Sequence, residues 1–295
     1  MPSSDTDIRR TFRVMRHAAL LAVTLLTSAC LADPTPSDPV TTNPINSTTL
    51  SSLLSKLTLS DEDDFSGGVN APPDPRMWNI DIGNRWGNGK ETQAYTADPA
   101  NVRQDGAGHL VLEATTTDGR VTSARINTEG KTQLTDGLIA ARIKMPAGQG
   151  LHPAFWMLGS SLRTAGWPAC GEIDIVEFIN DGSLAYFTIH GPPSDTRQAG
   201  PDGDVQLQST KASRNLVDEF HTYWMYKQSR RVIMGIDDNQ VAGFSADHLR
   251  QGWKWVYDGP FFAVLNVAVG GDWPGPLTPG VLPKQMVVDW IRLYR

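Results

Sequence analysis

The chain has 295 residues, with 26 Lys and Arg against 32 Asp and Glu, and a formal net charge of −6. An acidic chain lacks the basic face that releases counterions from a phosphate backbone, so we expect no nucleic-acid partner. Two cysteines are too few for a disulfide scaffold, and an apolar fraction of 40% is too high for wholesale disorder.

The first thirty residues have the pattern of an export signal. Four arginines between residues 9 and 16 precede an apolar run from Ala18 to Leu26. This run is too short to cross a bilayer as a helix, which needs about 20 apolar residues. We expect a signal peptide over residues 1–29 and an exported protein, extracellular or on the cell surface.

The end of this signal resembles the lipobox of bacterial lipoproteins, because the sequence from Thr27 runs Thr-Ser-Ala-Cys and ends at Cys30. The resemblance implies a lipid on Cys30, which would be the protein's only contact with a membrane. Ordinary cleavage nearby, with a free thiol at Cys30, is the alternative.

Residues 30–58 read as a flexible linker. Pro34, Pro36, Pro39 and Pro44 lie among Ser, Thr and Asp, and no aromatic residue is present to be buried. Such a stretch cannot offset the entropy lost on ordering. We therefore expect the folded domain to span residues 59–295.

The body of the chain reads as many short strands. Between Ile139 and Met145 apolar side chains recur at every second position, which is typical of a half-buried strand. Clusters of Gly, Pro, Asn and Asp separate further apolar runs, and long amphipathic stretches are scarce. We predict an all-β fold with two antiparallel sheets packed face to face. The further runs are 110–114, 154–158, 173–178, 184–190, 222–226, 232–236, 261–269 and 287–294.

The run from Glu172 to Phe178 carries three acids inside an apolar strand. Glu172 and Asp174 point to one face, whereas Glu177, five residues after Glu172, would point to the other in a regular strand. One extra residue, a β-bulge, would return Glu177 to the face of the first two. The spacing therefore predicts a bulged strand with three carboxylates on one surface.

Two carboxylates that face one bond suit glycoside hydrolysis, in which one attacks or activates water and the other protonates the leaving oxygen. A third acid between them raises the proton affinity of at least one member of the set. The alternatives from spacing alone are a solvated strand face or a calcium site. Calcium would want more oxygen ligands than three acids on one strand supply.

Several motifs in order along the chain resemble glycoside hydrolase family 16, and within it the bacterial laminarinase-like endo-β-1,3-glucanases. The similarity covers Asp63 to Arg295. The matching segments are 86–95, 122–127, 141–144, 153–158, 172–177, 220–223 and 266–275.

This resemblance implies a curved antiparallel β-jelly-roll sandwich with a concave substrate cleft, and a retaining mechanism. It assigns Glu172 as the nucleophile, Glu177 as the general acid and base, and Asp174 as the residue that orients Glu172. It also implies that His190 lies beside the acids. Asn88 and Glu91 match a substrate-side loop, although this chain carries one extra residue between them.

Indole rings stack on the apolar faces of sugars, so tryptophans near the acids are substrate-binding candidates. Trp156 shares a strand face with Ala154, and Trp167 lies in the loop before the acid strand; Trp273 resembles a tryptophan at the cleft edge of the family. A role in core or loop packing is the alternative for Trp156 and Trp273.

Asp64 and Asp289 match positions that hold a structural calcium in several relatives. We expect no cofactor for catalysis and keep this structural calcium as a hypothesis. The expected function is endo-hydrolysis of β-1,3-glucans of the laminarin type by a monomer. The alternatives are mixed-linked glucan or a galactan as substrate, transglycosylation, or a non-catalytic glucan-binding module.

Overall fold

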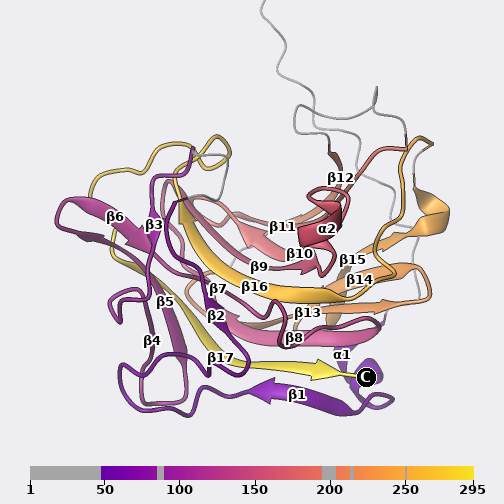
Figure 1. Ribbon diagram of the computed structural model, residues 1–295, viewed down its shortest axis with the longest axis horizontal. Coiled ribbons are helices and arrows are strands. Elements are labelled where there is room, and N and C mark those ends of the chain that lie inside the picture. Colours follow the sequence, from indigo (N-terminus) through magenta and orange to yellow (C-terminus); the bar gives the residue numbers. More distant parts are fainter. Residues whose placement is uncertain (1–47, 85–89, 195–203, 213–215, 250) are drawn as a thin grey trace, which may run out of the picture. The chain divides into compact units, whose positions relative to one another are not determined.

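The computed structural model describes residues 48–84, 90–194, 204–212, 216–249 and 251–295 (Figure 1). The chain divides into two compact units, Met1–Asp38 and Pro39–Arg295, and every described residue belongs to the second. The predicted signal peptide (residues 1–29), Cys30 and Asn88 lie outside the described residues.

Three short helices occur in the described ranges: α1 (Leu50–Leu54), α2 (Leu162–Ala165) and the 3-10 helix η3 (Ala246–His248). None of these is long and apolar enough to cross a membrane. The remaining regular structure is β, as the strand pattern predicts.

The described strands form two sheets. In the ten-stranded sheet the order is β15-β14-β13-β8-β17-β5-β6-β3, with β1 added beside β17 and β4 beside β5. Its strands are β1 (Leu59–Asp63), β3 (Ala94–Tyr95), β4 (Val102–Gln104), β5 (Leu110–Thr117), β6 (Arg120–Ser123), β8 (Gly137–Lys144), β13 (Phe220–Gln228), β14 (Arg231–Ile236), β15 (Asn239–Ser245) and β17 (Lys284–Tyr294).

The seven-stranded sheet has the order β12-β11-β10-β9-β16-β7-β2 among the described residues. Its pairs are antiparallel, and Figure 1 shows β9, β10 and β16 as one layer over β8, β13 and β17. Its strands are β2 (Asn79–Ile80), β7 (Arg125–Asn127), β9 (Leu151–Gly159), β10 (Glu172–Phe178), β11 (Leu184–Gly191), β12 (Val205–Ala212) and β16 (Phe261–Val269).

The main hydrophobic core lies between the two sheets. Ile139, Ala141 and Ile143 of β8 are fully buried in it, and so are Ile173 of β10 and Leu265 of β16. The period of two read in β8 therefore marks the face that packs on the other sheet, and the predicted two-sheet sandwich is confirmed. Burial of one such large aliphatic side chain contributes about 1.5–3 kcal/mol.

The linker prediction for residues 30–58 is wrong for its last part, because residues 48–58 are folded. Thr49 caps α1 with its side chain, and Leu53 is buried against Leu138 and Trp224 on the outer face of the ten-stranded sheet. Thr58 then exchanges backbone hydrogen bonds with Arg295 at 2.8 and 2.9 Å. Apolar side chains on the short helix supply the burial that the Pro-rich residues before it cannot.

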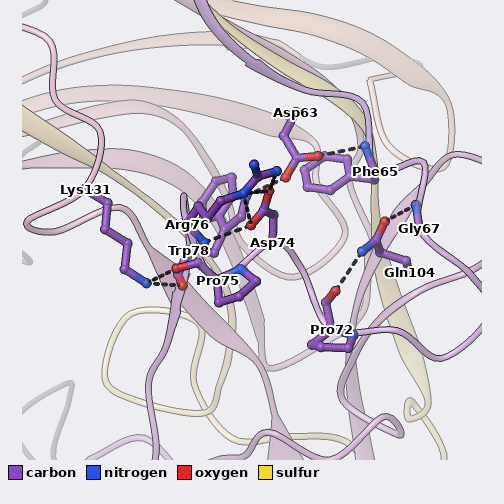
Figure 2. A network of polar contacts seen from close by, with 10 residues as sticks. All are labelled: Asp63, Phe65, Gly67, Pro72, Asp74, Pro75, Arg76, Trp78, Gln104 and Lys131. Atoms are coloured by element: carbon purple, nitrogen blue, oxygen red, sulfur yellow. Dashed lines mark hydrogen bonds and ion pairs between the residues drawn. The ribbon is translucent and has the colours of Figure 1, made fainter.

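Side chains fix the irregular segment that follows β1 (Figure 2). Asp63 at the end of β1 accepts hydrogen bonds from the backbone N–H of Phe65 and from Nε1 of Trp78, both at 2.9 Å. Lys131, which follows β7, donates Nζ to the carbonyl of Trp78 at 2.6 Å. This network connects β1 of the ten-stranded sheet to the seven-stranded sheet.

The other half of Figure 2 centres on Gln104 of β4. Its Oε1 accepts from the backbone N–H of Gly67 at 2.6 Å, and its Nε2 donates to the carbonyl of Pro72 at 2.7 Å. A Cβ at Gly67 would lie 2.5 Å from the amide of Gln104. Only glycine fits at this position unless Gln104 moves.

Candidate active site

The acid strand is β10, and it carries the bulge that its spacing predicts. Glu172 pairs with His190 of β11, and Asp174 pairs with Thr188, but the register shifts before Glu177 pairs with Tyr186. The pairing with β9 shifts in the same stretch. The extra residue restores the alternation, so Glu177 returns to the face of Glu172 and Asp174. We call these three carboxylates the acid row.

The residues behind the acid row are apolar and buried. Ile173, Ile175, Val176 and Phe178 each have 0% exposure and belong to the main core. Both residues of the bulge therefore face inward, which leaves the acids as the polar side of the strand.

Glycines allow the close approach of the chain at the start of β10. Gly159 at the end of β9 donates its N–H to the carbonyl of Gly171 at 3.0 Å. A Cβ at Gly159 would lie 1.9 Å from the carbonyl oxygen of Cys170. The backbone just before Glu172 is thus held against β9 in a way that no larger residue permits.

Burial and like charge raise the proton affinity of Glu172 and Asp174. Burial raises the pKa of Glu172, and the neighbouring Glu177 raises it further, against the effect of His190. Burial, Glu177 and Glu172 together raise the pKa of Asp174 well above its ordinary value. Asp174 is only 2% exposed, so water does little to stabilise its ionised form.

His190 lies beside the acid row, where the resemblance placed it. Its Nε2 is 3.3 Å from Oδ2 of Asp174, and its Nδ1 is 2.6 Å from Oδ2 of Asp204. Burial lowers the pKa of His190, but the contacts with the two aspartates outweigh it and the net shift is upward. The two aspartates therefore favour the protonated form of the imidazole.

Two members of this site escape sequence reasoning. Asp204 precedes β12 and orients His190 from the side opposite Asp174. His152 of β9 places Nε2 2.8 Å from Oε1 of Glu177. The available signal for His152 was its place two residues before Ala154 on the same face of the strand; Asp204 had no local signal.

Tryptophans flank both ends of the acid row. Trp167 is 39% exposed, and its Nε1 donates to Oε2 of Glu172 at 2.9 Å. Trp273 is 41% exposed, and its ring packs edge-on against His152 and Tyr186 with centroids 5.0 and 4.7 Å apart. Exposed indoles beside buried carboxylates are the arrangement expected of a sugar-binding surface.

Trp156 is fixed by polar contacts in the middle of the same face. It pairs with Asp174 across the β9–β10 ladder, and its Nε1 donates to Oδ1 of Asn266 at 2.7 Å. The guanidinium of Arg125 lies 4.7 Å from its ring centroid. Trp156 therefore belongs to the acid-row face and not to the core between the sheets.

Glu91 reaches the same region from the segment before β3. It forms a backbone bridge with Gly270, and its Oε2 accepts from Nε2 of Gln93 at 2.5 Å. Its negative charge contributes to the raised pKa of His152. The structure thus brings Glu91 near the Glu177 end of the acid row.

The two residues suggested for calcium do not fit a calcium site in this chain. Asp289 is the extra residue of a bulge in β17, and its Oδ2 accepts from Nη1 of Arg142. The guanidinium already neutralises this carboxylate, and Asp64 is exposed. Calcium needs six to eight oxygen ligands.

Among the described residues, one group of three brings potential metal ligands together: Glu172, Asp174 and His190, with ligand atoms within 4.8 Å of one another. These groups belong to the acid row and its histidine. The ion pair of His190 with Asp174 and the charges of the row account for the cluster.

The arrangement presents two glutamates on one surface, separated by a buried aspartate and flanked by indoles. A protein with this surface can attack a sugar at one carboxylate and protonate its leaving oxygen at the other. Comparison with known proteins supports this chemistry. A beta-glucanase of Rhodothermus marinus is 34% identical over 256 residues, which cover 81% of this chain and 85% of that protein.

The chain belongs to glycoside hydrolase family 16. A family model described as "XgeA-like, catalytic GH16 domain" matches residues 88–230. The laminarinase catalytic domain of Thermotoga maritima is 35% identical and superimposes with a TM-score of 0.70, covering 81% of this chain and 98% of that one. A keratan-sulfate endo-1,4-beta-galactosidase of Sphingobacterium multivorum is 30% identical, over 94% of this chain and 66% of that protein. The family 16 match and the jelly-roll neighbours agree with the predicted fold.

Proposed function

We propose that this family 16 domain is a retaining endo-β-1,3-glucanase that cleaves internal bonds of laminarin-type glucans. The observation that carries the proposal is the bulge in β10, which puts Glu172 and Glu177 on one face of the strand with Asp174 between them. The similarity to a beta-glucanase and to a laminarinase catalytic domain supports the choice of substrate.

In the proposed mechanism Glu172 attacks the anomeric carbon while Glu177 protonates the leaving oxygen. The glycosyl–enzyme bond is then hydrolysed by a water whose proton passes to Glu177. Trp167 holds Oε2 of Glu172 through its indole N–H. Asp174, whose pKa burial and the two glutamates raise, lies beside Glu172 and orients it.

Trp156, Trp167 and Trp273 supply the apolar surface for sugar rings in this proposal, and Glu91 and His190 supply polar contacts near the acids. Asn88 is proposed for the same substrate-side loop from the sequence resemblance alone. The domain acts without a cofactor, because protonation and nucleophilic attack both come from its own carboxylates.

A second substrate class remains as an alternative because of the relatives. The similar protein of Sphingobacterium multivorum is named as a galactosidase acting on keratan sulfate. The same acids can serve a galactan or a mixed-linked glucan. In this alternative the loops around the acid row, and not the acids themselves, distinguish axial from equatorial hydroxyl groups of the sugar.

We also propose that the protein is exported and anchored to a membrane through a lipid on Cys30. The support is the N-terminal sequence pattern, with its arginines, its short apolar run and the Cys that ends it. Fractionation of cells that produce the full chain tests this proposal. Release of the protein from the membrane fraction by Cys30→Ser is the expected result, and a wild-type protein that is already soluble would contradict it.

Hydrolysis of a substrate panel tests the main proposal. The full chain is incubated with laminarin, lichenan and agarose, and products are separated by mass and followed by proton NMR during the first turnovers. We expect fastest hydrolysis of laminarin, internal cleavage, and β-configured new reducing ends. Faster hydrolysis of agarose would favour the galactan alternative, and binding without hydrolysis would favour a glucan-binding module.

A further inference from the structure

His152 holds one oxygen of Glu177 and leaves the other without a described partner. Nε2 of His152 lies 2.8 Å from Oε1 of Glu177, and the two side chains are 21% and 12% exposed. Among the described residues, no hydrogen bond reaches Oε2 of Glu177. A proton donor needs this asymmetry, because the oxygen that carries the proton must be free to meet the substrate.

The imidazole of His152 is fixed by its surroundings. Its backbone lies in β9, opposite Ala268 of β16, in the middle of the seven-stranded sheet. Its ring packs at 84° against Trp273, which itself packs against Tyr186 of β11. The N–H is therefore aimed at Glu177 before any substrate binds, which limits the entropy lost on reaching the reactive geometry.

The ionisable groups that face His152 are acids and one phenol. Glu177 and Glu172 come from β10, Glu91 comes from the segment bridged to Gly270, and Tyr186 lies behind Trp273. On β16 the facing residue is the uncharged Ala268. Burial lowers the pKa of His152, but the hydrogen bond to Glu177 and the three glutamates raise it more. The hydrogen bond and these charges favour a proton on Nε2, where Oε1 of Glu177 can accept it.

We infer that His152 is the positioning residue of the proton donor: its N–H fixes Oε1 of Glu177 and stabilises the carboxylate that forms when Oε2 gives up its proton. This inference rests on the proposed function, in which Glu177 is the general acid. It adds a residue that neither the acid-row motif nor the spacing of the tryptophans indicates.

The proton and electron changes balance without any further reagent. As the bond from the anomeric carbon to the leaving oxygen breaks, its electron pair goes to that oxygen, which takes the proton from Oε2 of Glu177. A carboxylate oxygen of Glu172 bonds to the carbon. In the second half a water attacks the carbon, its proton passes to Oε2, and Glu172 leaves. His152 keeps its own proton throughout and donates most strongly while Glu177 is charged.

Two variants of His152 distinguish the effect of its N–H donor from the effect of its ring packing. His152→Phe keeps an aromatic ring against Trp273 and removes the donor, whereas His152→Gln offers an amide N–H at a similar reach. We expect His152→Phe to lose about 10–100-fold in kcat/KM on laminarin, which is less than the roughly 10²–10⁴-fold that general acid catalysis supplies because Glu177 itself remains. We expect the alkaline limb of its pH–rate profile to move up by about one unit, because the carboxylate has lost a donor. His152→Gln should recover most of the rate.

An activated substrate distinguishes positioning from a structural effect. A 2,4-dinitrophenyl β-laminaribioside needs no protonation of its leaving group, so its burst phase should be within about threefold of wild type in His152→Phe. His109→Phe is the matched control: His109 also pairs with a carboxylate, Asp105 at 2.7 Å, and follows the turn before β5 in the ten-stranded sheet. It should leave both rate and pH profile unchanged.

The results separate this inference from the proposed function. If wild type cleaves laminarin and His152→Phe has the wild-type rate and pH profile, the inference is overturned and the function stands. An equal loss on laminarin and on the activated substrate also overturns it, because a structural defect slows both. If wild type cleaves no β-1,3-glucan, the proposed function fails first.

Discussion

The domain contains two groups of acids whose neighbours differ in kind. In the network of Figure 2, Asp63 receives donors on both oxygens, and Asp74 is hydrogen-bonded to Arg76. In the acid row, Asp174 is packed between Glu172 and Glu177 and has the imidazole of His190 as its positive neighbour. One group is surrounded by donors and the other largely by like charge.

The proton affinities of Asp74 and Asp174 differ accordingly. The side-chain hydrogen bond from Arg76 lowers the pKa of Asp74, whereas burial and two glutamates raise the pKa of Asp174. Burial raises the pKa of Asp63 as well, but the hydrogen bonds from Phe65 and Trp78 oppose that shift. Acids that accept hydrogen bonds from neighbouring N–H groups stabilise the fold around them. Acids kept buried beside one another lower its stability, and such an arrangement is maintained where chemistry needs it. Replacement of an acid by an uncharged residue should therefore lower the stability of the fold in the network of Figure 2 and raise it in the acid row.

The largest expected effect follows from removing the proposed nucleophile. Glu172→Gln keeps the shape of the side chain and a hydrogen-bond acceptor for Trp167 but cannot form the glycosyl–enzyme bond. We expect hydrolysis of laminarin to fall on the order of 10⁴-fold or more, with binding retained. Reducing-sugar release and affinity electrophoresis in laminarin gels measure the two quantities.

The matched control for Glu172→Gln is Asp63→Ala in the other region. Asp63→Ala removes the acceptor of Trp78 and should cost about 1–3 kcal/mol of stability while leaving kcat unchanged. Near-normal turnover by Glu172→Gln would show that the acid row is not the reaction centre. Loss of turnover by a fully folded Asp63→Ala variant would show that Asp63 also affects the reaction, which contradicts its assignment to fold stability alone.

A smaller effect on activity is expected from deleting Val176. The bulge places both Ile175 and Val176 in the core, so removal of one residue leaves a regular strand whose alternation still puts Glu172, Asp174 and the last glutamate on one face. Phe178 likewise keeps its place in the core. We expect activity to fall about 10–100-fold, far less than in Glu172→Gln, and stability to fall by about 1–3 kcal/mol for the lost packing.

A deletion variant as inactive as Glu172→Gln would contradict this account, because the alternation of a regular strand would then fail to return the last glutamate to the face of Glu172. Laminarin hydrolysis and thermal melts of the deletion variant measure the two effects.

The bulge could be predicted from the sequence because the alternation of a strand is local, and three acids within six residues satisfy it in one way only. His152 and Asp204 could not be predicted, because their contacts depend on how β9 pairs with β10 and how the segment before β12 reaches β11. Thr49 as a helix cap and the leucines after it indicate the helix α1, but the prolines before it led to the prediction of a linker for the whole segment.

A moderate effect on stability is expected at Asp174, with a defined pH dependence. Its pKa is raised in the folded protein above the ordinary 3.8, so the folded state binds more protons than the unfolded state above that pH. Stability from this group is complete below about pH 4 and is lost as pH rises through the folded pKa. Asp174→Asn removes the loss, and its melting temperature should exceed that of wild type at pH 8 by roughly 2–4 °C.

Thermal melts of wild type and Asp174→Asn from pH 4 to pH 8 measure this difference. The two curves should converge toward pH 4 and separate as pH rises, and the variant should have lost most of its activity. Asp63→Ala should instead melt below wild type at every pH. A variant at Asp174 that melts below wild type at pH 8 would mean that His190 stabilises the ionised aspartate by more than its glutamate neighbours destabilise it.

The smallest expected effect concerns the calcium ion that the sequence resemblance implied at Asp64 and Asp289. Because Arg142 occupies the carboxylate of Asp289, addition of calcium or of EDTA should shift the melting temperature by less than about 1 °C. Arg142→Leu removes the guanidinium and frees Asp289, so the same titration on that variant asks whether the cation alone excludes the ion. A calcium-dependent gain in the variant but not in wild type would show that Arg142 replaces a metal ion, whereas a clear gain in wild type would contradict the assignment of Asp289 to an ion pair.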